Sequence, residues 1–292
     1  MTNLLELVEL RPVLGDGAMG TMLLERGLKV GACPEVWNLE QPEVVAGVHK
    51  AYVDVGCDFI ETNTFGANPI KLARFGLEDR LNDIIKAGID LARKAAGDAC
   101  LVAASVGPTG ALLQPHGDTP REKVADAFRA TAQIMAEAGV DFFIVETMSD
   151  LEEAKLAIGA IREFSDKPVV ATMTFTRGPK GFRTVMGATP QQCAVALAEA
   201  GAHILGTNCC AGPKEAAEII AEMGEASRCP LIAQPNAGIP KLEAGKTTYP
   251  ESPESFAAGI EEVLARGAMI VGGCCGTTPQ HIREVAALMG KC

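Results

Sequence analysis

The chain has 292 residues, of which 48% are hydrophobic and 22% charged, and its formal net charge at pH 7 is −11. This acidic balance disfavours binding to nucleic acid or to an anionic membrane, because both would repel the average surface. Aromatic residues make up only 4%, which argues against a base-stacking surface, so composition indicates an α/β enzyme or binding protein.

Ten cysteines occur along the chain. The acidic amino terminus does not resemble a signal peptide, and no window offers the roughly 18 apolar residues that a membrane span requires. We therefore expect a cytoplasmic protein whose thiols are reduced and whose clustered cysteines form metal or redox sites. Isolated cysteines are expected to be small core residues, and the terminal Cys292 is expected to have no role.

Short apolar runs recur along the chain, each followed by turn residues and an amphipathic segment. They predict strands near Val13–Met19, Cys57–Asn63, Leu101–Gly107, Asp141–Thr147, Pro168–Phe175, Ile204–Cys209, Pro230–Asn236 and Met269–Cys275. The runs are continuous rather than alternating, which is typical of parallel strands covered on both faces.

The segments between the strands carry helix start and stop signals. Starts are expected at Thr119-Pro120, Ser149, Thr189-Pro190, Ser252-Pro253 and Thr278-Pro279, and stops at Gly139, Gly201 and Gly267. Eight alternating units predict a (β/α)8 TIM barrel, one domain spanning residues 1–292. The longer connections all follow strands, so they should lie at the carboxyl face of the barrel, where catalytic sites are usually built.

Adjacent Cys274 and Cys275 close the eighth predicted strand, and Cys209 closes the sixth. Neighbouring cysteines cannot form an ordinary disulfide without strain. Strands six and eight of a barrel are separated by one strand, so the three sulfurs can meet at one ion. Three thiolates leave a tetrahedral Zn²⁺ one open position, which is the mark of a catalytic zinc site.

The glycine pair Gly272-Gly273, just before these cysteines, supports a second interpretation. Glycines after the eighth strand of a barrel are also how phosphate-binding loops are made, and cysteine is a common core residue. From the residues alone, a zinc site and a phosphate cradle with inert thiols both remain open. An iron–sulfur cluster is disfavoured, because such clusters usually need four cysteines.

A glycine-rich turn, Gly15–Thr21, ends the first predicted strand and contains Asp16. Glycines there let backbone amides approach a ligand, and Asp16 can accept hydrogen bonds from an ammonium group, although a tight turn with a capping aspartate would look the same. Glu146 ends a fully apolar strand, where a carboxylate is costly unless it is paired or functional. Together the two carboxylates could hold an α-amino group.

These residues combine into a recognisable pattern, which runs from about residue 10 to residue 290. The sequence resembles the homocysteine S-methyltransferase family, most of all the homocysteine-binding barrel of cobalamin-dependent methionine synthases. The motifs that carry the resemblance are Gly15–Thr21, Glu61–Asn68, Ser105–Gly110, Glu146, Gly206–Cys209, Gln234–Gly238 and Gly272–Gly276.

The resemblance implies that Cys209, Cys274 and Cys275 bind one Zn²⁺ and that the fourth position receives the sulfur of homocysteine. It also implies that Asn236 offers an oxygen to zinc when substrate is absent. Cys210 lies outside the pattern and is expected to be a packed neighbour.

The same resemblance implies the contacts of the amino acid. Asp16 and Glu146 would hold the amino group of homocysteine. Amides near Gly17 and Ala18, helped by the loop at Ser105, would take its carboxylate.

The methyl donor is inferred from the branch of the family. Thr147 stands where the betaine-using branch has a tyrosine, and few aromatic residues are present to cage a quaternary ammonium. None of the four histidines lies in a corrinoid-ligand motif. Because the sequence most resembles the cobalamin-dependent synthases, we expect the donor to be a methylated corrinoid carried by a separate protein. S-methylmethionine or another small donor is the first alternative, and a metal-free barrel for a phosphorylated ligand is the second.

Overall fold

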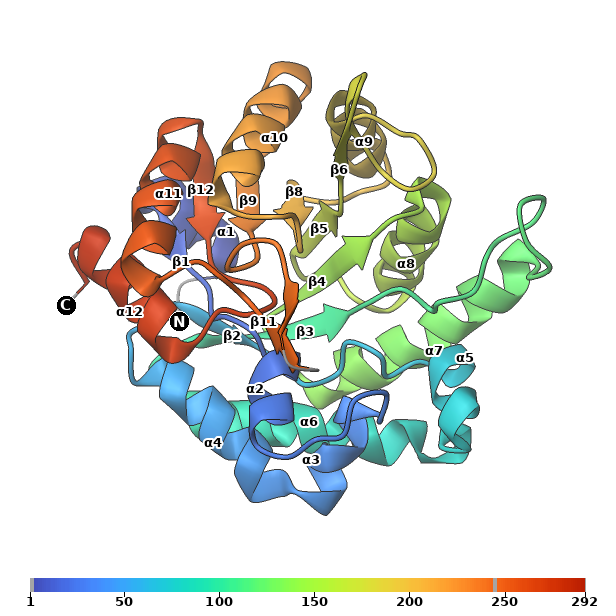
Figure 1. Cartoon of the computed structure of the whole chain (residues 1–292). Coiled ribbons are helices and arrows are strands. Elements are labelled where there is room, and N and C mark those ends of the chain that lie inside the picture. Colours follow the sequence, from blue (N-terminus) through green and yellow to red (C-terminus); the bar gives the residue numbers. More distant parts are fainter. Residues whose placement is uncertain (1–2, 244–245, 292) are drawn as a thin grey trace.

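The computed structural model describes residues 3–243 and 246–291, and within them eight parallel strands form one nearly closed barrel (Figure 1). The strands, in the order in which they neighbour one another, are β1 (Val13–Leu14), β12 (Ala268–Val271), β9 (Leu231–Gln234), β8 (Ile204–Asn208), β5 (Val169–Met173), β4 (Phe142–Met148), β3 (Leu101–Val106) and β2 (Phe59–Glu61).

Closure of the ring is completed between β1 and β2, where the Asp58 amide donates to the Leu14 carbonyl at 2.7 Å. The predicted TIM barrel is therefore confirmed. That a single domain spans residues 1–292 stays a prediction, and Cys292 lies outside the described residues.

An outer ring of helices covers the barrel (Figure 1). One helix follows each strand: α4 (Pro42–Val53), α6 (Leu81–Ala96), α7 (Arg121–Ala138), α8 (Leu151–Phe164), α9 (Pro190–Glu199), α10 (Pro213–Ala226), α11 (Pro253–Ala265) and α12 (Pro279–Leu288). Shorter helices lie in the connections: α2 (Gly20–Glu25), α3 (Trp37–Glu40) and α5 (Pro69–Leu72), with 3₁₀ turns at Pro34–Val36, Ala73–Phe75 and Glu78–Arg80.

The core has two layers, because successive strand residues point to opposite faces. One set packs outward against the helices, and the other fills the barrel with side chains such as Phe59, Phe142 and Ile270. An amino-terminal helix that the sequence did not predict, α1 (Leu4–Leu10), packs Leu4 and Val8 into this interior cluster. It therefore closes the amino end of the barrel.

The predicted helix starts are only partly right. Thr189 accepts from the Gln192 amide in a capping box, as expected. The start expected at Thr119-Pro120 is wrong by one residue, because α7 begins at Arg121, after Pro120, and has no side-chain cap. The start expected at Ser149 is also wrong, since the neighbouring Asp150 caps α8 instead.

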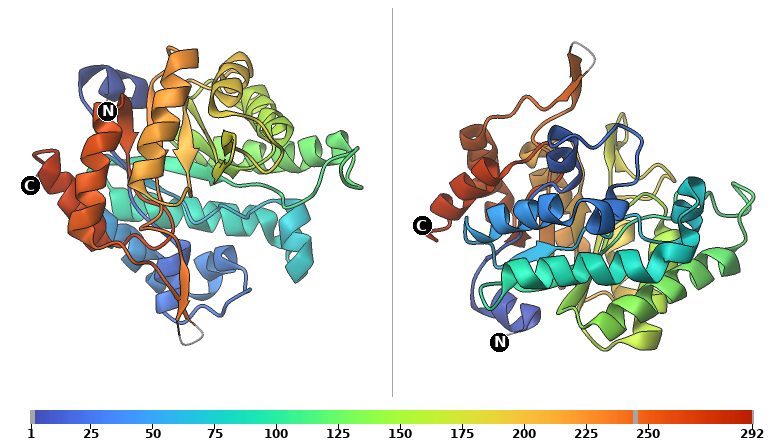
Figure 2. Two further views of the ribbon diagram at one scale, coloured as in Figure 1. Left: turned by 45° about the horizontal axis from the view of Figure 1, so that its top comes forward. Right: turned by 90° about the horizontal axis from the view of Figure 1, so that it is seen from below.

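Two hairpins extend the connections at the carboxyl face, and the sequence did not predict either. One consists of β6 (Thr176–Gly178) and β7 (Gly181–Arg183), and the other of β10 (Lys241–Glu243) and β11 (Lys246–Thr248). Figure 2 shows that the β10–β11 hairpin and α1 lie at opposite ends of the barrel. Within the described ranges, no helix is long and apolar enough to cross a membrane.

Candidate functional site

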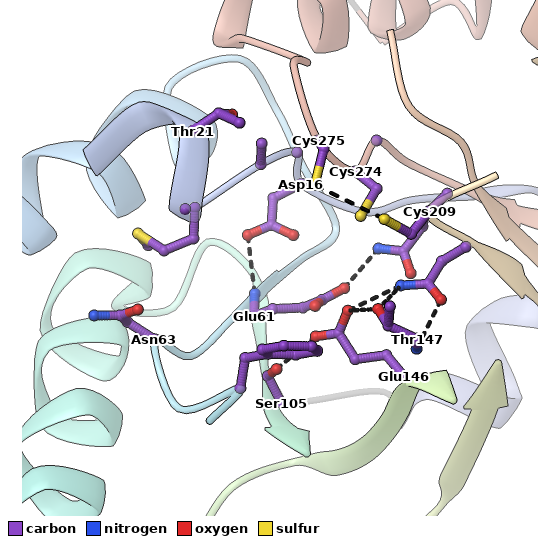
Figure 3. A pocket seen from close by; sticks show the side chains of 18 of the residues that line it. Asp16, Thr21, Glu61, Asn63, Ser105, Glu146, Thr147, Cys209, Cys274 and Cys275 are labelled. Carbon is purple, nitrogen blue, oxygen red and sulfur yellow. Dashed lines mark hydrogen bonds between the residues drawn. The ribbon is translucent and has the colours of Figure 1, made fainter. Parts of the chain in front are cut away.

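Three cysteine sulfurs converge at the carboxyl face of the barrel (Figure 3). Cys209 follows β8, and Cys274 and Cys275 follow β12, with β9 between these strands. The three Sγ atoms lie within 4.8 Å of one another, and those of Cys209 and Cys275 are 3.8 Å apart. Tetrahedral zinc with bonds of about 2.3 Å places two sulfurs about 3.8 Å apart. The spacing therefore fits a shared zinc ion.

The three thiols compete for protons. Hydrogen bonds from Cys209 and Cys274 lower the pKa of Cys275 to about 3, while hydrogen bonding to Cys209 and Cys275 raises the pKa of Cys274 well above its ordinary value. A divalent cation bound to all three sulfurs would remove this competition, because coordination stabilises each thiolate.

Cys210, the residue after Cys209, is directed away from the sulfur cluster. It is buried, and its Sγ donates to the Gly212 carbonyl at 3.8 Å. Its place agrees with the expected role as a packed neighbour.

Asn208, the residue before Cys209, is hydrogen-bonded to the carboxylate of Glu146. The Asn208 side-chain nitrogen donates to Glu146 Oε2 at 2.9 Å and to Thr147 Oγ1 at 2.8 Å. Its oxygen accepts from the Thr147 amide and from the Thr172 hydroxyl. Every hydrogen-bonding position of this buried amide is thus used, which fixes both strand ends.

Backbone strain is concentrated at the same two strand ends. Among non-glycine residues of the described chain, only Thr147 and Cys209 have positive φ, at 58° and 52°. For the β-branched Thr147 this conformation is a genuine outlier. Such strain persists where the surroundings impose it, which is common in functional sites.

Asp16 and Glu146 both line a cavity of about 350 Å³, which the three cysteines also line. Asp16 follows β1, is 3% exposed and accepts from the Glu61 amide at 2.9 Å. Glu146 lies on β4, is 8% exposed and accepts from the Ser105 hydroxyl at 2.5 Å. Burial raises the pKa of both carboxyl groups.

The backbone near Asp16 offers fewer free amides than the motif suggests. The Ala18 amide donates to Thr277 Oγ1 at 3.1 Å. Gly17 packs so tightly that a Cβ there would lie 2.7 Å from the same hydroxyl oxygen. Because the Ser105 hydroxyl is bonded to Glu146, the geometry makes Ser105 a support for that carboxylate.

Asn236 follows β9, and its backbone amide donates to the carbonyl of Cys210 at 3.2 Å. Its Oδ1 is buried and has no hydrogen-bond partner within the described residues. An orphaned buried acceptor is costly unless a cation or donor meets it. The donor set near the cysteines therefore fits a metal ion.

The amides of Gly272 and Gly273 are engaged by the protein. The Gly272 amide donates to the Ala233 carbonyl at 3.2 Å, and the Gly273 amide donates to the Asp16 carbonyl at 2.9 Å. A phosphate cradle needs such amides free to point at the ligand. This observation disfavours the phosphate-binding alternative.

A sequence model described as homocysteine S-methyltransferase matches residues 13–289 of the chain. The chain belongs to the homocysteine S-methyltransferase family. Two relatives are named methionine synthase: that of Mycobacterium leprae is 36% identical over 100% of this chain, and that of Mycobacterium tuberculosis is 36% identical over 99%. The chain spans only about a quarter of their length, 25% and 26% respectively.

Solved structures of a homocysteine methyltransferase share the fold. The metallated form of the homocysteine methyltransferase MmuM from Escherichia coli has a TM-score of 0.78 and 24% identity, over 95% of this chain and 96% of that chain. Its oxidized form has a TM-score of 0.77 and 25% identity over the same shares.

The polar residues that line the pocket also include Glu61, Asn208 and Gln234. Sequence reasoning quoted them within motifs but assigned them no role. The signal that could have found them is the one that singled out Glu146, a polar side chain at the end of an apolar strand.

Proposed function

We propose that the chain transfers a methyl group to the thiol of homocysteine, giving methionine, with one zinc ion held by Cys209, Cys274 and Cys275. Membership of the family supports this reaction. The observation that carries the zinc assignment is the convergence of the three sulfurs at the spacing that one tetrahedral ion requires.

Zinc bound to three thiolates would keep the substrate thiol ionised at neutral pH, where a free thiol with a pKa of about 8.5 is mostly protonated. The Oδ1 of Asn236, which has no partner in the described part of the chain, would complete the donor set in the absence of substrate. The protein's part is then to hold the substrate sulfur in line with the donor's methyl carbon, so that positioning lowers the barrier.

The amino acid is positioned at its other end. Asp16 and Glu146 would accept hydrogen bonds from the α-ammonium group, since both are buried carboxylates that face the cavity beside the cysteines. The backbone at Gly17 remains the proposed contact for the carboxylate of the substrate. The Ala18 amide and the Ser105 hydroxyl serve only after they leave their partners Thr277 and Glu146.

The donor that we propose is a methylated corrinoid on a partner protein. This is supported by the methionine synthase relatives, of which the chain covers a quarter. A small methylsulfonium compound such as S-methylmethionine is the alternative.

Elemental analysis followed by a donor assay tests the proposal. We expect one zinc per chain, and methionine formation from homocysteine with methylcobalamin. Turnover with S-methylmethionine but not with methylcobalamin would overturn the corrinoid donor. A metal-free protein without turnover on any donor would overturn the proposed function.

A further inference from the structure

The pocket is lined by more acidic side chains than the two, Asp16 and Glu146, that the proposed substrate binding uses. Among the described residues that line it, four are carboxylates and none is Lys, Arg or His. One carboxylate, Glu35, is engaged by the Gly66 amide at 2.6 Å and the Cys33 thiol at 3.1 Å. Glu61 is the carboxylate that has no assigned role.

Glu61 ends β2 and lies between the other two carboxylates (Figure 3). Its backbone amide donates to Asp16 Oδ2 at 2.9 Å, and its side chain lines the same cavity as that of Glu146. Its Oε1 accepts from Gln234 Nε2 at 2.6 Å. The three carboxylates therefore belong to one cluster that faces the same cavity.

Buried carboxyl groups that line one cavity repel one another when ionised, so the ionisation of one opposes the ionisation of the next. Burial, and then the charges of Glu146 and Asp16, raise the pKa of Glu61 well above its ordinary value. The groups around Glu61 are Asp16 after β1, Glu146 on β4 and the neutral Gln234 on β9, and the described lining offers no basic side chain. Burial and mutual repulsion therefore favour one proton on the pair formed by Glu61 and Glu146 when the pocket is empty.

Gln234 supplies an independent sign that a donor-rich ligand belongs here. The residue is 3% exposed and lines the pocket, and its Oε1 is buried without a hydrogen-bond partner in the described chain. Because its nitrogen donates to Glu61, its oxygen is the atom left over. An ammonium group, with three N–H donors, can serve this oxygen and neighbouring carboxylates together.

We propose that Glu61 is a third carboxylate for the α-ammonium of the amino-acid substrate, and that the proton shared by Glu61 and Glu146 passes to solvent when the ammonium enters. The identity of the amino acid rests on the proposed function. The exchange balances, because one positive charge replaces another and no bond of the substrate breaks. Carboxylic acids that carry a thiol but no amino group cannot displace the proton.

Calorimetric titration at pH 7 in two buffers of different ionisation enthalpy counts the released protons. L-methionine has the ammonium but no thiol, so the zinc-loaded chain should release about one proton per methionine. L-homocysteine should release about two, because its thiol also ionises. The isosteric variant Glu61→Gln should release about one proton fewer with each ligand.

Glu153→Gln is the matched control, since Glu153 is also buried but accepts from Thr109 at 2.8 Å outside the pocket. It should keep the wild-type proton count. A second test needs no variant: 4-(methylthio)butyrate, which is methionine without its amino group, should release no proton.

Three results would overturn the inference. They are a methionine titration without proton release, an unchanged count in Glu61→Gln, and no binding of either amino acid. The proposed function can fail while this inference holds. In that case no donor would support methyl transfer, but methionine binding would still release about one proton.

Discussion

The side-chain nitrogen of Asn208 donates to Glu146 Oε2 at 2.9 Å, and the next residue along the chain is Cys209. Asn208 therefore positions the carboxylate proposed to bind the substrate ammonium, and the next residue is a proposed metal ligand. This arrangement fixes the separation between the two ends of the substrate, which in-line methyl transfer requires.

Asn208→Ala should raise the KM for homocysteine by about 10- to 100-fold, since a hydrogen bond to a charged group contributes about 1.5 to 3 kcal/mol. Zinc content should stay at one per chain, because the sulfurs remain. Asn68→Ala is the control: this buried amide caps α5 by accepting from the Lys71 amide, so its loss should lower stability and leave KM unchanged. An unaltered KM in Asn208→Ala would contradict the positioning role.

Cys274→Ser should lose most of its zinc and reduce methyl transfer by more than about 100-fold, the upper end of what loss of an outer-shell partner costs. Cys210→Ser should retain both, because the Cys210 sulfur is bonded to the Gly212 carbonyl away from the cluster. Elemental analysis and initial rates measure the two effects. Equal zinc content in the two variants would show that the sulfur cluster is not the metal site.

His49 makes stability depend on pH. Its ring is fully buried on α4, neither ring nitrogen has a partner among the described residues, and burial lowers its pKa from 6.5 to about 4. The unfolded chain therefore binds this proton more readily, so stability is lost as the pH falls below 6.5. Between pH 7 and pH 5 the loss from this group should be about 2 kcal/mol.

Urea unfolding of His49→Leu at the two pH values checks this expectation. The variant should lose less free energy of unfolding on acidification than the wild type does, by the same amount. His116→Leu, at an exposed position, should behave like the wild type. The assignment fails if His49→Leu and wild type respond to acid alike.

Gly206 is required by a close approach of neighbouring strands. A Cβ built on it would overlap the carbonyl oxygen of Ile232 on β9. Gly206→Ala should therefore cost at least about 1 to 3 kcal/mol of unfolding free energy, the usual cost of overpacking. Gly224→Ala, in α10 with its nearest atom 3.5 Å away, should instead stabilise by up to about 1 kcal/mol. Thermal unfolding of both variants compares them.

The barrel and the meeting of the sulfurs could be predicted from the sequence because both follow from periodicity and strand order. Eight apolar runs separated by capped helices specify the ring, and Cys209 and Cys274 then fall at nearby strand ends. Substrate roles assigned to Ser105 and Ala18 were less secure, because their hydrogen-bond partners lie on other strands or loops. The Ser105 hydroxyl is bonded to Glu146, 41 residues away, and the Ala18 amide to Thr277, 259 residues away.

Other features depend on tertiary contacts that local patterns do not encode. The interaction of Gln234 with Glu61 joins residues 173 positions apart. Helix α1 is stabilised by packing Leu4 and Val8 under the barrel, and its short sequence gives a weak periodic signal. The hairpins at the carboxyl face are short and lie in connections, where composition says little about pairing.

Zinc K-edge X-ray absorption before and after addition of L-homocysteine tests the central claim most directly. We predict three sulfur neighbours at about 2.3 Å with one lighter ligand in the free protein, and four sulfur neighbours once homocysteine is bound. A first shell without three sulfurs, or one that homocysteine leaves unchanged, would contradict the account.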